Sequence, residues 1–273
     1  MPFVPVGGID LYCEQAGEGP RLLFINGTGG DLRQKPRLID GPLAGAFEIL
    51  AYDQRGLGRS GKPDEPYSMA GYADDAAGLL DQVGWERCHV LGVSFGGMVA
   101  QELALRHPDR VDRLVLACTS SGGEGGVSYP LHELEEQGSE EYMRRVIAIG
   151  DRRWSDAQSG RDPRQFEKIL EIMWSRQGQF DSGEDPSLVA IGSRRQLEAR
   201  MAHDTWDRLP DIEAETFLAA GRYDGIAKPE NMENLARRIP NATLEFFEGG
   251  HIFLLEDRSA FRRIIGFLKG ECA

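Results

Sequence analysis

The sequence has little of what marks several large classes of protein. Its 273 residues include four cysteines and no C-x-x-C pair, which argues against a zinc finger or a redox dithiol and favours free buried thiols. No apolar run is long enough to span a membrane, and the first residues lack the basic and apolar segments of a signal peptide. We therefore expect a soluble, cytoplasmic protein that does not bind a membrane.

Positive charge is also scarce. Lysine and arginine total 31 against 44 acidic residues, which gives a formal net charge of -13. No basic stripe is present of the kind that neutralises phosphates, so nucleic acid is not an expected partner. The hydrophobic content of 41% is sufficient for a substantial core.

Short apolar runs alternate with amphipathic helical ones in both terminal parts of the chain. The continuous apolar runs 88–93 and 111–117 are typical of parallel strands that are buried on both faces. The pattern predicts an α/β fold in which helices cover both faces of a mostly parallel sheet. The predicted strands are 3–6, 11–14, 21–26, 47–52, 88–93, 111–117, 216–220 and 243–247, and the predicted helices are 68–83, one ending at residue 107, 229–239 and 259–269.

A helical, charged stretch interrupts this alternation. Asp162-Pro163 and Asp185-Pro186 each place an N-cap acid before a proline that suits the first turn of a helix. We predict a helical cap at 120–209, inserted into a core domain made of residues 1–119 and 210–273. The sequence does not predict the oligomeric state.

The strongest chemical signal is the G-x-S-x-G sequence of residues 92–96. It lies between an apolar strand and a helix, where a serine on a sharp turn is held exposed at the end of the strand. Glycines two residues before and after Ser94 leave room for the chain to double back. Ser94 is the predicted nucleophile, and the backbone N–H of Phe95 is a predicted oxyanion donor. The alternative interpretation is a glycine-rich turn in which the serine has no catalytic role.

A serine hydroxyl needs a base to take its proton. Of the five histidines, only His251 follows a core strand in a loop able to reach Ser94. His203 lies in the predicted cap, where it is a candidate for the substrate pocket. The remaining three, for which surface or packing roles are expected, are His89, His107 and His132.

The base in turn needs an acceptor that fixes its tautomer. Asp224 directly follows a predicted strand, and the chain order of serine, acid and histidine is the one associated with G-x-S-x-G hydrolases. The alternative acids, Asp204 and Asp207, follow no core strand.

A second oxyanion donor is expected from the glycine-rich loop that follows strand 21–26. We predict the N–H of Thr28, with Gly27 and Gly29 as alternatives, and we expect Asn26 and Gly27 to contact substrate. A plain surface turn is the alternative interpretation.

Residues 56–61 match G-x-G-x-x-G, but a proline-rich stretch follows where a nucleotide site needs a helix N-terminus. No Walker A or H-E-x-x-H sequence is present either. No cofactor and no metal are therefore predicted.

With these motifs in place, the chain resembles the α/β-hydrolase superfamily along nearly its whole length. Residues 53–60 resemble its D-x-R-G-x-G-x-S loop, and 107–111 its usual join between helix and strand. Residues 26–33, which begin with Asn26 instead of the common His-Gly, and residues 92–101 are similar to the 3-oxoadipate enol-lactonase and carboxylesterase branch. A serine at the elbow disfavours haloalkane dehalogenases and epoxide hydrolases, which use aspartate there.

The expected function is hydrolysis of a small-molecule ester or lactone through an acyl-enzyme on Ser94. The alternatives are hydrolysis of a C–C bond or a thioester on the same triad, a cofactor-free oxygenase, and a ligand sensor with slow turnover. Trp154, Trp174 and His203 are predicted to contact substrate. Further apolar residues that could wall the pocket, or form the core of the cap instead, are Met173, Phe180, Met201 and Trp206.

Overall fold

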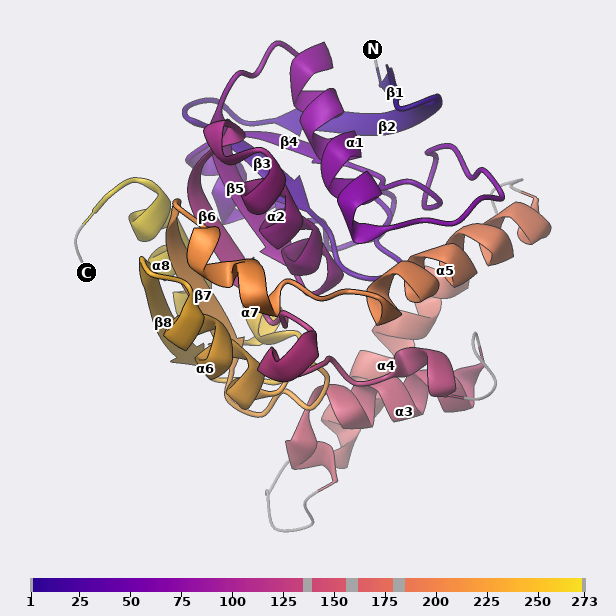
Figure 1. Cartoon of the computed structure of the whole chain (residues 1–273). Helices are drawn as coiled ribbons and strands as arrows, with labels where there is room; N and C mark the ends of the chain where they lie inside the picture. The colour runs from indigo at the N-terminus through magenta and orange to yellow at the C-terminus, as the bar shows by residue number, and fades with distance from the viewer. Residues whose placement is uncertain (1, 135–138, 156–161, 179–184, 272–273) are drawn as a thin grey trace.

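A computed structural model describes residues 2–134, 139–155, 162–178 and 185–271. Within these ranges an eight-stranded sheet has the order β1-β2-β4-β3-β5-β6-β7-β8 (Figure 1). Strands β3 to β8 are parallel, and β1 and β2 extend the sheet as antiparallel strands. The bounds are β1 Phe3–Val6, β2 Ile9–Ala16, β3 Arg21–Ile25, β4 Glu48–Tyr52, β5 Cys88–Val93, β6 Val111–Ala117, β7 Glu215–Gly221 and β8 Ala242–Phe247.

Helices cover both faces of the sheet, as the continuous apolar strands predict. Residues of α1 (Met69–Gln82), α2 (Phe95–Arg106) and α6 (Pro229–Arg238) bury one face, and residues of α8 (Arg258–Leu268) bury the other. Successive residues of a strand enter opposite layers: Leu22 and Leu23 are both fully buried but belong to different core clusters. The fold class expected from the sequence is therefore confirmed.

Local sequence signals explain why these helices begin where they do. Ser68 is the N-cap of α1, and its side chain accepts a hydrogen bond from the Gly71 N–H at 3.0 Å. The predicted apolar stripe of this helix is buried, including Tyr72, Ala76 and Leu79. The short helix α7 (Phe253–Glu256) has no such signal and lies just after His251.

A helical insertion lies between β6 and β7. It contains α3 (Glu140–Gly150), α4 (Pro163–Gly178) and α5 (Pro186–Met201), which Figure 1 shows gathered at one end of the molecule. Asp185 caps α5 by accepting from the Ser187 N–H, and Asp162 accepts from the Arg164 N–H before α4. Both helix starts are as predicted. The domain limits at residues 120 and 209 stay a prediction.

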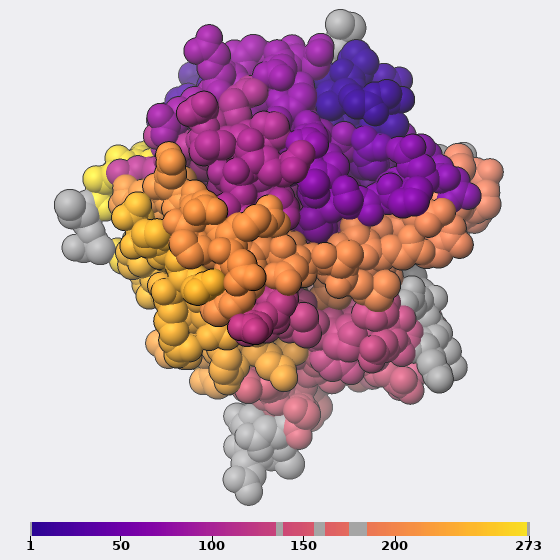
Figure 2. All heavy atoms as spheres, in the orientation of Figure 1, coloured from indigo at the N-terminus to yellow at the C-terminus, as the bar shows by residue number. Residues whose placement is uncertain are grey.

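Helix α5 is docked tightly on the core. A Cβ on Gly192 would lie 1.9 Å from the Gly56 carbonyl oxygen, so the two backbones are in direct contact. Arg195 of the same helix pairs with Asp64 at 2.8 Å. In Figure 2 the orange atoms of α5 lie against the purple atoms of the segment that follows β4. This docking fixes one helix of the insertion relative to the sheet.

Cys13, Cys88 and Cys118 are buried and free, as expected, while Cys272 lies outside the described residues. In the part of the chain that the structure describes, no helix is long and apolar enough to cross a bilayer.

Candidate active site

Ser94 occupies a strained turn between β5 and α2. Its backbone has φ 55° and ψ -115°, a conformation that residues with a side chain rarely adopt. A Cβ at Gly92 would lie 2.3 Å from the Gly96 carbonyl oxygen, and one at Gly96 would lie 2.1 Å from that of Ile25. Only glycine fits at these two positions, which is why the spacing G-x-S-x-G is needed here.

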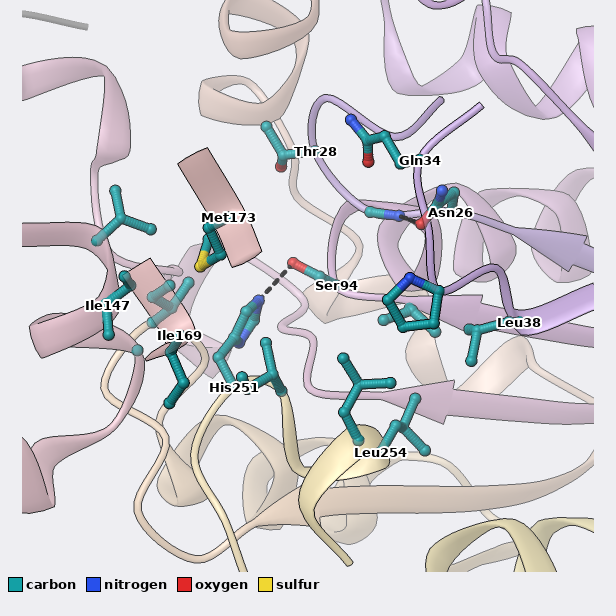
Figure 3. Close-up of a pocket in the computed structure, with 18 of the residues that line it drawn as sticks. Asn26, Thr28, Gln34, Leu38, Ser94, Ile147, Ile169, Met173, His251 and Leu254 are labelled. Atoms are coloured by element: carbon teal, nitrogen blue, oxygen red, sulfur yellow. Dashed lines mark hydrogen bonds between the residues drawn. The ribbon is translucent and has the colours of Figure 1, made fainter. Parts of the chain in front are cut away.

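The structure brings the three predicted triad residues together. His251 Nε2 lies 2.9 Å from Ser94 Oγ (Figure 3). His251 Nδ1 lies 2.8 Å from Asp224 Oδ2. Both distances are those of hydrogen bonds. A proton can therefore pass from the serine hydroxyl to an imidazole whose other nitrogen already faces a carboxylate.

Asp224 is held rigidly at the carboxyl end of β7. It is fully buried, and its Oδ1 accepts from the N–H groups of Ile226 and Ala227 at 2.8 and 2.9 Å. These bonds leave Oδ2 for His251. The alternative acids do not contact His251 in the structure: Asp204 accepts from the Trp206 N–H, and Asp207 pairs with Arg238.

The helical insertion also positions the histidine. The backbone N–H of His251 donates to the carbonyl of Gly150, at the C-terminal end of α3, over 2.7 Å. A Cβ on the preceding Gly250 would meet that same carbonyl oxygen at 2.3 Å. The loop of His251 is thus packed directly against α3.

The loop after β3 narrows the choice of second oxyanion donor. The Gly27 N–H donates to Oδ1 of Asn26, and the Gly29 N–H donates to Oε1 of Gln196, both at 2.9 Å. The Gly30 N–H bonds to the Gly27 carbonyl. Among the described residues, the N–H of Thr28 has no protein acceptor and remains available to a ligand. The N–H of Phe95 is likewise at the first position of α2, where no preceding turn supplies a carbonyl.

These groups surround a cavity of about 330 Å³. Asn26, Gly27, Thr28 and Trp154 line it together with Ser94 and His251, and the contacts of these four residues with substrate stay a prediction. Apolar side chains lie on both sides of the serine: Ile147, Ile169 and Met173 on the side of the insertion, and Leu38 and Leu254 on the other (Figure 3).

Two predicted contacts are wrong. Trp174, on α4, is 42% exposed and is not among the described residues that line the cavity. His203 is buried, and its Nε2 is 3.2 Å from the Ser120 carbonyl oxygen, which makes it part of the protein interior. Burial lowers the pKa of His203 to about 4, so this ring is neutral.

Of the further aromatic and methionine residues considered for the pocket, Met173 is the only described one that lines the cavity. Met201 is largely exposed, Trp206 stacks with the guanidinium of Arg238, and Phe180 lies outside the described residues.

Sequence reasoning missed Gln196 and the apolar residues that follow His251. Gln196 is 1% exposed and lies on α5, so its contact with Gly29 joins segments 167 residues apart. Nothing in the sequence around it marks this role. Leu254 had a signal, since it follows His251 by three residues in an apolar run.

The G-x-G-x-x-G match of residues 56–61 has a structural role. The carboxylate of Asp53 accepts from the N–H groups of Leu32 and Arg59, and a Cβ on Gly58 would lie 2.2 Å from it. Burial raises the pKa of Asp53 to about 6, against the effect of the two N–H donors. The motif therefore ties the loop after β4 to the loop that carries Thr28.

Cys118, Asp224 and His251 are the described residues whose ligand atoms cluster closely enough to hold a metal ion. The carboxylate of Asp224 is already engaged by two amides and the imidazole. Burial also raises the pKa of Cys118 well above its ordinary value, which disfavours a thiolate ligand. The donor set therefore fits a hydrogen-bonded relay better than a metal centre.

Comparison with known proteins agrees with this geometry. A family model described as the alpha/beta hydrolase fold matches residues 20–258. The chain belongs to the α/β-hydrolase fold family and is a hydrolase.

The similar proteins are named for different substrates. A 2-hydroxymuconate semialdehyde hydrolase from a Pseudomonas strain is 38% identical, over 95% of this chain and 90% of that protein. The structure of an N-acyl homoserine lactone degrading enzyme is similar with a TM-score of 0.76 at 28% identity, covering 97% of this chain and 98% of that one. An enol-lactonase from Burkholderia xenovorans has a TM-score of 0.77 at 23% identity, covering 99% and 100%, and shows the same fold.

Proposed function

We propose that this protein hydrolyses an ester or lactone through an acyl-enzyme on Ser94. The observation that carries the proposal is the hydrogen-bonded relay from Ser94 Oγ through His251 to Asp224, at 2.9 and 2.8 Å. His251 takes the serine proton as Oγ attacks the carbonyl carbon, and it returns that proton to the leaving alcohol. Water, activated by the same histidine, then releases the acid.

The N–H groups of Thr28 and Phe95 are assigned to the oxyanion of each tetrahedral intermediate. Both are backbone donors beside Ser94, and the amides next to Thr28 already have acceptors. Each such donor contributes about 3 to 4 kcal/mol of transition-state stabilisation in serine hydrolases. The reaction then needs no cofactor and no metal.

A second candidate is hydrolysis of a C–C bond in a meta-cleavage product. It is favoured by the identity of 38% to a 2-hydroxymuconate semialdehyde hydrolase. The ester or lactone assignment is supported by the solved lactone-degrading enzyme, by the resemblance of the loop at residues 26–33 to enol-lactonases, and by the apolar cavity. Both reactions are compatible with the same triad.

Rapid mixing with p-nitrophenyl butanoate tests the assignment. We expect a burst of one equivalent of p-nitrophenol, a butanoyl adduct on the Ser94 peptide by mass spectrometry, and neither signal from Ser94→Ala. A meta-cleavage dienone assayed in parallel separates the candidates. Faster turnover of that dienone, with no acyl adduct from any ester or lactone, would replace the first candidate by the second.

A further inference from the structure

The charged residues of the cavity wall are mostly acidic. Asp31, Asp151 and Glu256 line it, against a single described cation, Arg37. Asp31 and Asp151 are 5% and 4% exposed, so water screens their charges weakly. Among the described residues that line the cavity, Arg37 is the one arginine or lysine that a substrate carboxylate could meet.

Arg37 is bound by two carboxylates of its own, which together form what we call the Arg37 clamp: Arg37, Asp40 and Glu14. Asp40 accepts from its Nε and Nη2 at 2.7 and 2.6 Å, and Glu14 accepts from Nη1 at 2.7 Å. The clamp has a formal charge of -1, although Arg59 approaches Glu14 to 3.8 Å on its other side. An incoming anion would therefore compete with two bound carboxylates for this guanidinium.

The other arginines close to the wall are paired in the same manner. Arg33 makes a bidentate pair with Asp31, and Arg153 makes one with Asp151, each with a shortest distance of 2.6 Å. Arg153 also lies 3.7 Å from Glu256. Each of these two cations neutralises a wall carboxylate, and neither lines the cavity itself. Bidentate pairs of this geometry are strong and well ordered.

The uncharged part of the wall determines which substrate groups the cavity favours. Ile147, Ile169 and Met173 lie on one side of Ser94, with Leu38 and Leu254 on the other (Figure 3). Substrate groups placed on either side of Ser94 would each face aliphatic surface, and such contact is favourable in proportion to the apolar area removed from water.

We propose that the natural substrate carries uncharged aliphatic groups on both sides of its scissile carbonyl, and that the Arg37 clamp selects against substrates bearing a carboxylate. This rests on the proposed ester or lactone hydrolysis. It distinguishes the protein from hydrolases whose substrates are dicarboxylic half-esters or other anionic acyl compounds.

Two esters of matched shape test the inference: butyl 6-methylheptanoate and monobutyl adipate, which differ at one end by an isopropyl group in place of a carboxylate. We expect kcat/KM to be at least about tenfold higher for the neutral ester, because like charges in a partly dry site repel strongly. Asp40→Asn removes one clamp carboxylate and should reduce this ratio at least about threefold. Glu245→Gln, which removes a carboxylate from an ion pair with Arg263 that does not line the cavity, is the matched control and should leave the ratio unchanged.

Equal or faster hydrolysis of monobutyl adipate by the native protein would overturn the charge selection. So would a ratio that Asp40→Asn changes no more than Glu245→Gln does. Binding of both intact esters to Ser94→Ala, measured as the rise in Tm, reports the same preference without turnover. A strong preference for the neutral ester in binding, with no hydrolysis by the native protein, would uphold the selection while refuting ester hydrolysis.

Discussion

The backbone N–H of Gly29 donates a hydrogen bond to Oε1 of Gln196 over 2.9 Å, and this bond joins the loop after β3 to helix α5 of the insertion. Gln196 is almost fully buried, and its Nε2 has no acceptor among the described residues. The Gly29 carbonyl in turn accepts from Nε2 of Gln34 at 3.1 Å. Gly29, the residue next to Thr28, is therefore held by hydrogen bonds to both its N–H and its carbonyl, which restrains the loop that carries the Thr28 N–H.

Gln196→Met keeps the volume of the side chain and removes the acceptor for Gly29. Loss of one such bond is expected to lower kcat about three- to tenfold with little change in KM, because the proposed donor loses its alignment in the transition state. Arg194→Met, at an exposed position of the same helix, should leave both constants close to native. A loss confined to KM, or an equal loss in both variants, would contradict a positioning role.

Asp224→Asn replaces the carboxylate that faces His251 Nδ1 at 2.8 Å. An amide here stabilises the wrong tautomer and cannot balance an imidazolium, so kcat should fall by about a hundredfold to ten-thousandfold. Asp207→Asn is the control, since the Asp207 side chain is 93% exposed and pairs only loosely with Arg238 at 3.4 Å. Ester hydrolysis that survives Asp224→Asn but not Asp207→Asn would show that the wrong acid was chosen.

His203 affects stability instead of substrate binding. Its pKa in the folded protein is about 4, below the ordinary value of 6.5, because burial disfavours the charged ring. Between these two values the unfolded chain binds more protons than the folded one, so stability is lost as the pH falls. From pH 7 to pH 4 this costs about 3 kcal/mol of unfolding free energy.

His203→Gln should remove that part of the pH dependence and leave KM for the ester unchanged. Urea unfolding at several pH values, with steady-state kinetics at pH 7, measures both. If the His203→Gln variant has native stability but a KM raised severalfold, His203 contacts the substrate.

Gly192→Ala separates helix propensity from packing. In an open helical position this change would stabilise the protein by about 1 kcal/mol. Here the new Cβ would lie 1.9 Å from the Gly56 carbonyl, so we expect a loss of about 1 to 3 kcal/mol as α5 is pushed off the core. Gly266→Ala in α8, where the Cβ meets no described atom nearer than Glu271 at 3.8 Å, should behave in the opposite way. Equal stabilisation of both variants, measured by thermal unfolding, would show that α5 is not held by this contact.

Local patterns predict most of the core because they act over a few residues. The apolar runs of β5 and β6, the Ser68 cap and the Asp-Pro starts of α4 and α5 each depend on short-range periodicity or capping. Ser94, Asp224 and His251 can be predicted for the same reason, since each lies within four residues after the end of a core strand.

The parts that the sequence did not predict depend on long-range contacts. Residue type and position in the insertion predict Trp174 and His203 as pocket residues, but which face of a helix points into a cavity is set by how that helix docks. The docking of α5 depends on Gly192 meeting Gly56, and no local signal marks either residue for that contact.

Ser94 is the proposed nucleophile, and its reactivity is expected to depend on His251. Labelling with a fluorophosphonate, followed by mass spectrometry of the peptides, tests it most directly. We predict one equivalent of phosphonate on the peptide that contains Ser94, none on Ser94→Ala, and labelling at least about a hundredfold slower for His251→Ala. Stoichiometric labelling at another serine, or labelling of Ser94 at an unchanged rate without His251, would contradict the account.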